Sequence, residues 1–165
     1  MGELISLMTK LEARRGCLRA VSAAEHYERG LECEAREDSV GAIAAYRRAL
    51  ASRPQLADAL NNLGRLLHDQ DQLGEAEALY RRAIAAQADV ALYWFNLGVI
   101  CEDTGRTDEA ITAYESALAI DGSLADAHFN LARQLEQLGR RGMDELVLRR
   151  AVRHLKRYRD LVRTA

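Results

Sequence analysis

Several scarcities in this 165-residue sequence exclude whole classes of structure. Pro54 is the only proline, and β-branched residues are sparse beside Ala, Leu, Arg and Glu, a composition typical of helices. The cysteines, Cys17, Cys33 and Cys101, are odd in number and form no Cys-x-x-Cys pair, which disfavours a disulfide framework and favours a reducing compartment. A secretory signal and an apolar run long enough to cross a bilayer are both lacking. We therefore expect an all-α, single-domain, cytoplasmic protein without membrane association.

Motifs of catalysis and of cofactor binding are also lacking. The four histidines show no metal-ligand spacing, and the sequence has neither a His-Glu-x-x-His motif nor a glycine-rich phosphate loop. We therefore predict no catalytic residues, no metal site and no cofactor, and we expect that the protein is not an enzyme.

What the sequence does contain is an internal repeat. The segment from Ala57 to Gly64 recurs from Ala91 to Gly98, which sets the period of the repeat at 34 (91 − 57). The two copies also agree downstream, at Asp69/Asp103, Glu75/Glu109, Ala76/Ala110, Tyr80/Tyr114, Ala83/Ala117 and Ala85/Ala119. A fixed period of this size predicts a solenoid, in which stacked repeats bury a core that no single repeat could close.

Four periods can be placed along the chain, each expected to form two antiparallel helices. Their predicted bounds are 23–56, 57–90, 91–124 and 125–158, which together give a repeat domain at 23–158. Residues 1–22 carry an apolar stripe at helical spacing and predict an amphipathic helix outside the repeat. Residues 159–165 are expected to end a capping helix.

A glycine recurs inside the first helix of three repeats, at Gly30, Gly64 and Gly98. Glycine within a helix costs about 1 kcal/mol relative to alanine, so its recurrence needs a packing reason. We expect the two helices of a repeat to cross closely at this glycine, with Tyr46, Tyr80 and Tyr114 filling the adjoining space.

The last predicted helix, from about Met143, is strongly basic. Between Arg140 and the end of the chain there are nine basic and three acidic residues. The helical pattern predicts that Leu148, Ala151, Leu155, Tyr158 and Val162 point inward, while Arg149, Arg150, Arg153, Lys156, Arg157 and Arg163 form the polar part. We expect this helix to close the array.

The repeated positions resemble the tetratricopeptide repeat. Its aromatic, Leu-Gly and small-x-x-x-aromatic signature is matched in the third repeat by Trp94, Leu97, Gly98, Ala110, Tyr114 and Ala117. The proline of the signature is present only at Pro54. The resemblance implies a right-handed superhelix whose concave groove is lined by the first helix of each repeat. It also implies a scaffold that holds a peptide or helix of another protein in that groove.

The resemblance further implies which residues would bind. Asn62, Asn96 and Asn130 recur at identical positions, and in similar proteins such asparagines hold the backbone of an extended peptide through their amides. Neighbouring groove positions predict an apolar pocket flanked by two arginines; the pocket residues are Leu92, Phe95, Val99 and Phe129, and the arginines are Arg65 and Arg133.

Three functions remain open at this point. The first is binding of a partner protein's peptide or helix in the groove. The second is homo-oligomerisation as a regulatory module of a larger protein. In that case the N-terminal helix or the apolar groove patch would bind another copy, for example by entry of the Leu4–Leu11 segment into its neighbour's groove. The third, least favoured, is contact of the basic C-terminal helix with nucleic acid.

Overall fold

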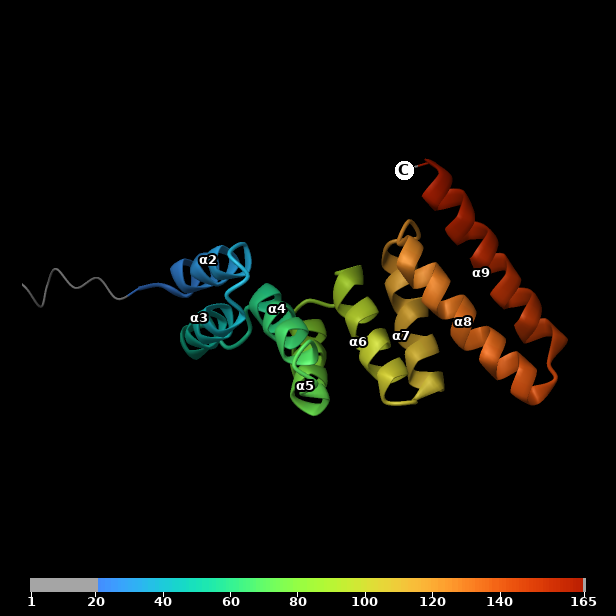
Figure 1. The fold of residues 1–165 in the computed structure, drawn as a ribbon, viewed down its shortest axis with the longest axis horizontal. Helices are drawn as coiled ribbons and strands as arrows, with labels where there is room; N and C mark the ends of the chain where they lie inside the picture. The colour runs from blue at the N-terminus through green and yellow to red at the C-terminus, as the bar shows by residue number, and fades with distance from the viewer. Residues whose placement is uncertain (1–20, 165) are drawn as a thin grey trace, which may run out of the picture.

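The computed structural model describes residues 21–164, which form eight α-helices arranged as four antiparallel pairs and no strand (Figure 1). The helices are α2 (Ala23–Glu34), α3 (Ser39–Ser52), α4 (Ala57–His68), α5 (Leu73–Ala86), α6 (Ala91–Asp103), α7 (Thr107–Ile120), α8 (Ala125–Gly142) and α9 (Glu145–Thr164). The predicted all-α solenoid is confirmed. The predicted helix at 1–22 lies outside the described residues except for its last two, and Cys17 lies outside them as well.

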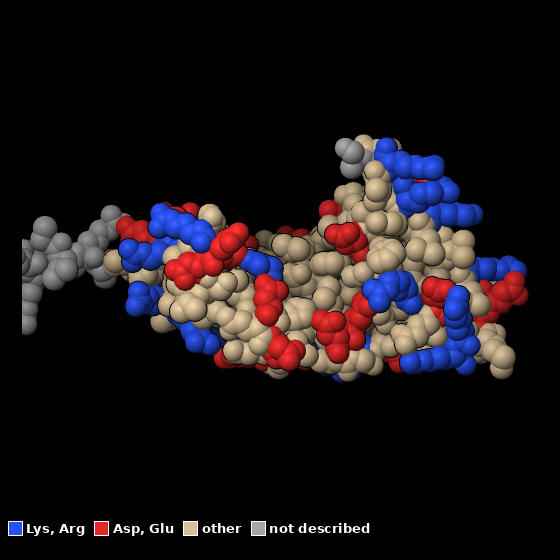
Figure 2. Space-filling model, in the orientation of Figure 1, with Lys and Arg blue, Asp and Glu red and all other residues tan. Residues whose placement is uncertain are grey.

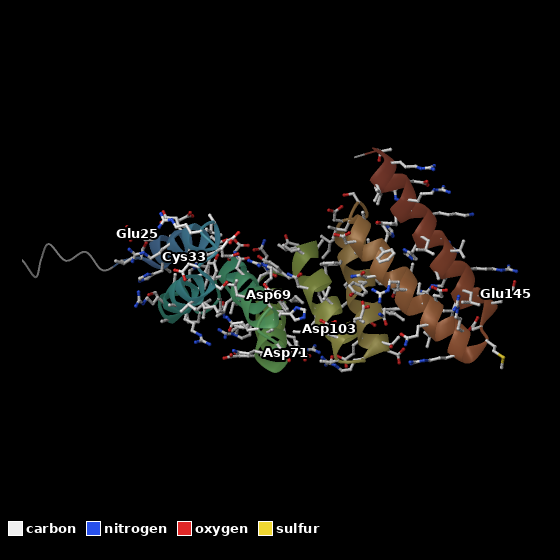
Figure 3. All side chains as sticks on the ribbon, in the orientation of Figure 1. Glu25, Cys33, Asp69, Asp71, Asp103 and Glu145 are labelled. Atoms are coloured by element: carbon white, nitrogen blue, oxygen red, sulfur yellow. The ribbon has the colours of Figure 1, made fainter. Side chains whose placement is uncertain are left out.

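The pairs stack in chain order, so that the molecule has two long sides. One side is formed by α2, α4, α6 and α8, and we call it the first-helix face. Polar side chains link successive helices on it: the Tyr93 hydroxyl donates to Asp58 (2.6 Å), and His68 pairs with Asp103 (2.7 Å). The other side is formed by α3, α5, α7 and α9. Cys33 of α2 and Glu145 of α9 lie toward opposite ends of the described chain (Figure 3).

The close helix crossing expected at the recurrent glycines is confirmed. A Cβ added to Gly98 would lie 2.5 Å from Tyr114 Cε1, and the corresponding distances are 2.3 Å for Gly30 and 2.9 Å for Gly64. The three tyrosine rings are fully buried, so they cannot move aside. Each of these helix pairs is therefore held at a separation that only glycine permits.

The fourth pair is longer than the others. Helix α8 has 18 residues, whereas α4 has 12 and α6 has 13. Gly139, near the end of α8, lies against Leu148, so the two helices make a close contact beyond the place of the usual crossing. The α8–α9 pair is a hairpin extended at its turn.

The extension changes the correspondence between α9 and the earlier second helices. Arg47 pairs with Glu75 and Arg81 with Glu109, each pair with a sequence separation of 28, whereas the Glu115–Arg150 pair has a separation of 35. Positions of α9 therefore correspond to positions of α7 at a spacing of 41, seven more than the period of 34. Seven residues are close to two helical turns, so the longer spacing leaves each residue on nearly the same side of the helix.

The longer spacing explains an inconsistency in the sequence pattern. A spacing of 34 places Asp144 at the position of Ala110, where a charged residue would face the core. A spacing of 41 places Ala151 there, and Ala151 is buried as Ala110 is. The fourth hairpin therefore keeps its small packing residue.

The expected inner residues of α9 need correction in two places. Ala151 is buried, and Leu148 and Tyr158 are half-buried, as predicted, but Leu155 and Val162 are exposed. Their places are taken by His154 and Leu161, which are half-buried. The inner side recurs at 151, 154, 158 and 161, and Leu155 and Val162 each follow it by one residue, about 100° around the helix.

Between residues 21 and 164, no helix has both the length and the apolar character that crossing a membrane requires. Among the cysteines within that range, Cys101 is buried and Cys33 half-buried, and both are free thiols.

Candidate binding face on the first helices

The three recurrent asparagines lie half-buried on α4, α6 and α8, one in each repeat after the first. Asn96 Nδ2 donates to Asn61 Oδ1 (2.8 Å), and Asn130 Nδ2 donates to the Tyr114 hydroxyl (3.3 Å). These bonds fix the orientation of the Asn96 amide relative to α4 and that of the Asn130 amide relative to α7.

The three amides differ in what they have left to offer. Asn62 Nδ2 donates to both Tyr27 and Tyr46 (3.4 Å each), and its Oδ1 accepts from Asn61 (3.2 Å). In contrast, Oδ1 of Asn96 and Oδ1 of Asn130 accept no hydrogen bond from any residue in 21–164, and each Nδ2 uses one bond. The amide of Asn62 is therefore already engaged, whereas the other two keep an unused acceptor.

A polar network on this face recurs at every second repeat. In its first copy the Tyr46 hydroxyl donates to Glu34 Oε1 (2.6 Å) and accepts from Asn62, while Arg65 pairs with Glu34. In its second copy the corresponding residues are Tyr114, Glu102, Asn130 and Arg133, with a Tyr114–Glu102 distance of 2.9 Å and an Arg133–Glu102 distance of 3.3 Å. Aromatic rings complete both copies, since Tyr27 lies 5.7 Å from Tyr46 and Phe95 lies 5.8 Å from Tyr114 between centroids.

The hydroxyls at the centre of the two copies stay protonated. Burial raises the pKa of Tyr46 above its ordinary value, partly opposed by the hydrogen bond from Asn62. Burial likewise raises the pKa of Tyr114, and the neighbouring Glu102 carboxylate raises it further. Each hydroxyl therefore donates to its glutamate at any physiological pH.

Arg65 and Arg133, the predicted flanking arginines, lie on α4 and α8 with the asparagines, and their charges are compensated. Arg65 contacts both Glu34 and Asp69, and Arg133 contacts Glu102. The guanidinium of Arg133 also lies 5.9 Å from the centroid of the Phe129 ring. Their attraction for an acidic ligand is reduced accordingly.

The four predicted apolar residues divide into two kinds. Phe95 and Val99 are half-buried and pack against the core. Leu92 and Phe129 are exposed, and the Phe129 ring contacts Tyr158 of α9 at 5.1 Å between centroids. In Figure 2 the upper outline is hollowed over α4 to α6, below the protruding end of α9. Because they are exposed, Leu92 and Phe129 are the apolar side chains of this set that are available to a ligand.

One cluster elsewhere has the composition of a metal site but not its chemistry. Ligand atoms of Glu77, Cys101 and Glu109 lie within 4.8 Å of one another. Both carboxylates are bound by arginines: Glu77 by Arg106 (2.7 Å) and by Arg81 (2.9 Å), and Glu109 by Arg81 (2.9 Å). The bond from Arg106 holds the pKa of Glu77 below its usual value, while burial raises the pKa of the Cys101 thiol. The cluster is an ion-pair network that joins α5 to the following repeat.

The residues that sequence reasoning missed are Glu34 and Glu102. Each accepts a hydrogen bond from the buried tyrosine of its own repeat and forms an ion pair with an arginine of the next repeat. Their signal is a recurrence at every second repeat, which a comparison of neighbouring repeats does not reveal.

A family model described as Tetratricopeptide repeat matches residues 27–91 and 69–125. The comparison with curated proteins returned no match.

Among solved structures, a crystal structure of MamA is similar with a TM-score of 0.77 and 21% identity, over 87% of this chain and 80% of that one. A structure titled as the functional characterization of Pseudomonas aeruginosa pilF is similar with a TM-score of 0.74 and 20% identity, over 85% of this chain and 61% of that one. An O-GlcNAc transferase mutant of Thermobaculum terrenum is 28% identical with a TM-score of 0.64, over 69% of this chain and only 22% of the transferase.

Proposed function

Because the chain belongs to the tetratricopeptide repeat family, we propose that it is a non-catalytic scaffold that binds an extended segment of a partner protein on its first-helix face. The observation that carries the proposal is a pair of amide oxygens, Asn96 Oδ1 and Asn130 Oδ1, which lie one repeat apart on that face and accept no hydrogen bond from residues 21–164. Amide oxygens accept hydrogen bonds from the backbone N–H groups of a peptide of any sequence.

Asn62 has a supporting part in this proposal. Its amide is held by Tyr27, Tyr46 and Asn61, so it orders the side chains around it and contacts the ligand less than the other two asparagines. The peptide backbone would therefore lie mainly over α6 and α8.

Side-chain preference would come from Leu92 and Phe129, which are exposed on the same two helices. Burial of apolar area on such residues supplies affinity, while the amides fix the backbone. Since Arg65 and Arg133 are already paired with glutamates, we expect a preference for apolar side chains and only a weak preference for acidic ones.

The test is selection of binders from a random peptide display library with the whole protein, followed by affinity measurement on variants. The double variant Asn96→Ala/Asn130→Ala should bind the selected peptides about tenfold or more weakly. Gln87→Ala, an exposed amide at the end of α5, is the matched control and should bind as the wild type does. Circular dichroism checks that each variant is folded. Equal binding by all three proteins would contradict the proposal.

Self-association stays an alternative prediction. It depends on the segment 1–22, which lies outside the described residues except for its last two. It is tested by light scattering over a range of concentrations. A mass equal to one chain at every concentration would rule it out, whereas growth of the mass with concentration that is lost on Leu4→Asp would support it.

A further inference from the structure

The outer surface of α9 carries a feature separate from the first-helix face. Arg149, Val152, Arg153 and Lys156 form what we call the terminal face; with Glu145 and the half-buried Leu148 they line a surface pocket of about 420 Å³. Basic side chains follow α9 along this end of the molecule in Figure 2. Between Glu145 and Thr164 there are seven Lys and Arg residues against two acidic ones.

Val152 occupies a position that the first and third repeats bury. At the longer spacing that applies to α9, Val152 corresponds to Ile111, and Ile43 holds the same position in the first repeat. Both isoleucines are 9% exposed, whereas Val152 is 51% exposed. The position faces the following repeat, as Glu77, its counterpart in the second repeat, shows by binding Arg106. Val152 is thus an apolar residue in the place where a further helix normally packs.

Lys156 extends the comparison to charge. It corresponds to Arg47 and Arg81, which pair with Glu75 and Glu109 at the start of the next second helix. Lys156 pairs with no carboxylate among residues 21–164. The terminal face therefore repeats the surface by which α3 holds the next repeat, where Ile43 and Arg47 are an apolar residue and a cation one turn apart.

We propose that the terminal face binds a helix of a partner protein, which places an apolar side chain on Val152 and a carboxylate near Lys156. The surrounding arginines favour further acidic residues along the edges of that helix. This site is independent of the peptide-binding proposal, because none of its residues lies on the first-helix face.

The chain itself fits the terminal face poorly. In a second copy stacked end to end, the position of Glu75 and Glu109 in the first repeat is held by Gly41, which offers no carboxylate. Residues 1–20 carry four basic and two acidic side chains, so their charge has the same sign as that of α9. A partner with an acidic helix is the complementary occupant.

Nucleic acid and anionic lipid also have negative charge, but neither explains the position of Val152. Nucleic acid binding rests on phosphate contacts and gains nothing from an apolar residue at a helix-packing position. A lipid surface favours a broad apolar side, whereas here the apolar residue lies among cations that match the pairing positions of a protein neighbour.

The experiment uses a fluorescent, stapled 18-residue helical peptide with one leucine stripe flanked by glutamates, and a twin with lysines in place of the glutamates. Binding to the whole protein is measured by anisotropy. The test variants are Val152→Asp and Lys156→Glu. The matched control is Val40→Asp, because Val40 on α3 is also a strongly exposed valine.

We expect the glutamate peptide to bind the wild type and Val40→Asp alike, and to bind Val152→Asp about tenfold or more weakly. Lys156→Glu should weaken binding of the glutamate peptide by about threefold or more and should strengthen binding of the lysine twin. The proposal is overturned if the wild type binds the two peptides equally, or if Val40→Asp and Val152→Asp behave alike. It is also overturned if a 20-base-pair DNA or anionic vesicles bind more tightly than the peptide and are insensitive to Val152→Asp.

Discussion

The α6–α7 and α8–α9 hairpins are two copies of one repeat pattern, but their helices are held together differently. In α6–α7 a glycine lies against the buried ring of Tyr114, which leaves no freedom in the helix crossing. In α8–α9 the same position is Ala132, the hairpin is longer, and two histidines meet across the interface, with 2.8 Å between His128 Nδ1 and His154 Nδ1. An inner repeat is fixed by steric fit, whereas the last is fixed by extra length and by a polar contact that depends on protonation.

The largest difference should appear when a methyl group is added at the inner crossing. Gly98→Ala places a Cβ 2.5 Å from Tyr114 Cε1 in a fully buried setting, so we expect a loss of about 2–3 kcal/mol in the free energy of unfolding. Urea denaturation followed by circular dichroism measures it. Gly74→Ala is the control, because an added Cβ there meets nothing within 4 Å, and it should be neutral or stabilising by up to about 1 kcal/mol. Similar losses for both variants would show that the crossing is not sterically fixed.

The next effect concerns the histidine contact of the last hairpin. His128 Nε2 lies 3.2 Å from the carbonyl oxygen of Gly122 and must donate to it, so in the neutral ring Nδ1 is an acceptor. His154 Nδ1–H then donates to His128 Nδ1, and protonation of His128 would leave two N–H groups facing each other. Burial, the neighbouring His128, and Arg150 and Arg153 lower the pKa of His154 to about 4. Burial lowers the pKa of His128 too, with Arg157 contributing.

The sign of the pH effect follows from these shifts. In the unfolded chain a histidine binds a proton below about pH 6.5, whereas folded His154 does so only near pH 4. The stability that comes from the neutral state of His154 is therefore present above pH 6.5 and lost as the pH falls from 6.5 toward 4, by about 2 kcal/mol after allowance for the exposed part of the ring. Thermal unfolding between pH 7 and 5.5 should show a steeper loss in the wild type than in His154→Leu. Equal slopes would contradict the assignment.

A smaller effect separates the tyrosines of the inner repeats. Tyr114→Phe removes a hydroxyl that donates to Glu102 (2.9 Å), and we expect a loss of about 1.5 kcal/mol. Tyr80→Phe is the matched control, since the Tyr80 hydroxyl forms no hydrogen bond with residues in 21–164, and it should cost less than about 0.5 kcal/mol. Chemical denaturation of the two variants side by side checks the difference. If Tyr80→Phe were the costlier change, the two-repeat network would not be the source of stability.

The smallest effect tests the shifted register of α9. Arg150→Glu places a carboxylate opposite Glu115 on the surface, and we expect a loss below about 1 kcal/mol. Adding Glu115→Arg should restore most of that loss, because the pair then has the polarity of Arg81–Glu109. Arg149→Glu in place of Arg150→Glu is the control and should show no such rescue. Rescue of Arg149→Glu instead would contradict the spacing of 41 between α7 and α9.

The sequence predicts the inner repeats well because many positions agree in phase between residues 57 and 124. Glycine and tyrosine recur together there for a steric reason, and that reason leaves a mark in every copy. The register of α9 could not be predicted in the same way. An extension of about two helical turns preserves the helical phase, so Leu148 and Ala151 continue to match the pattern at the ordinary period even though the structural spacing is longer.

The candidate site is predictable in position but not in chemistry. The three asparagines recur visibly, and the resemblance to the family places them on one face. The hydrogen bonds of each amide depend on residues that do not recur. Asn62 donates to the hydroxyl of Tyr27, whereas the residues at the position of Tyr27 in the later repeats have no aromatic hydroxyl; they are Asn61, Phe95 and Phe129. Distances between neighbouring helices decide such bonds, and a one-dimensional pattern does not contain them.

The two-repeat period of the polar network has a consequence for engineering the length of the array. A copy of residues 91–124 inserted after Leu124 would bring Val99 of the copy opposite Glu102, which would lose the partner that Arg133 now provides. A copy of residues 57–124 inserted at the same point would bring Arg65 of the copy there and keep every glutamate paired with an arginine. The module by which this array can be lengthened is two repeats.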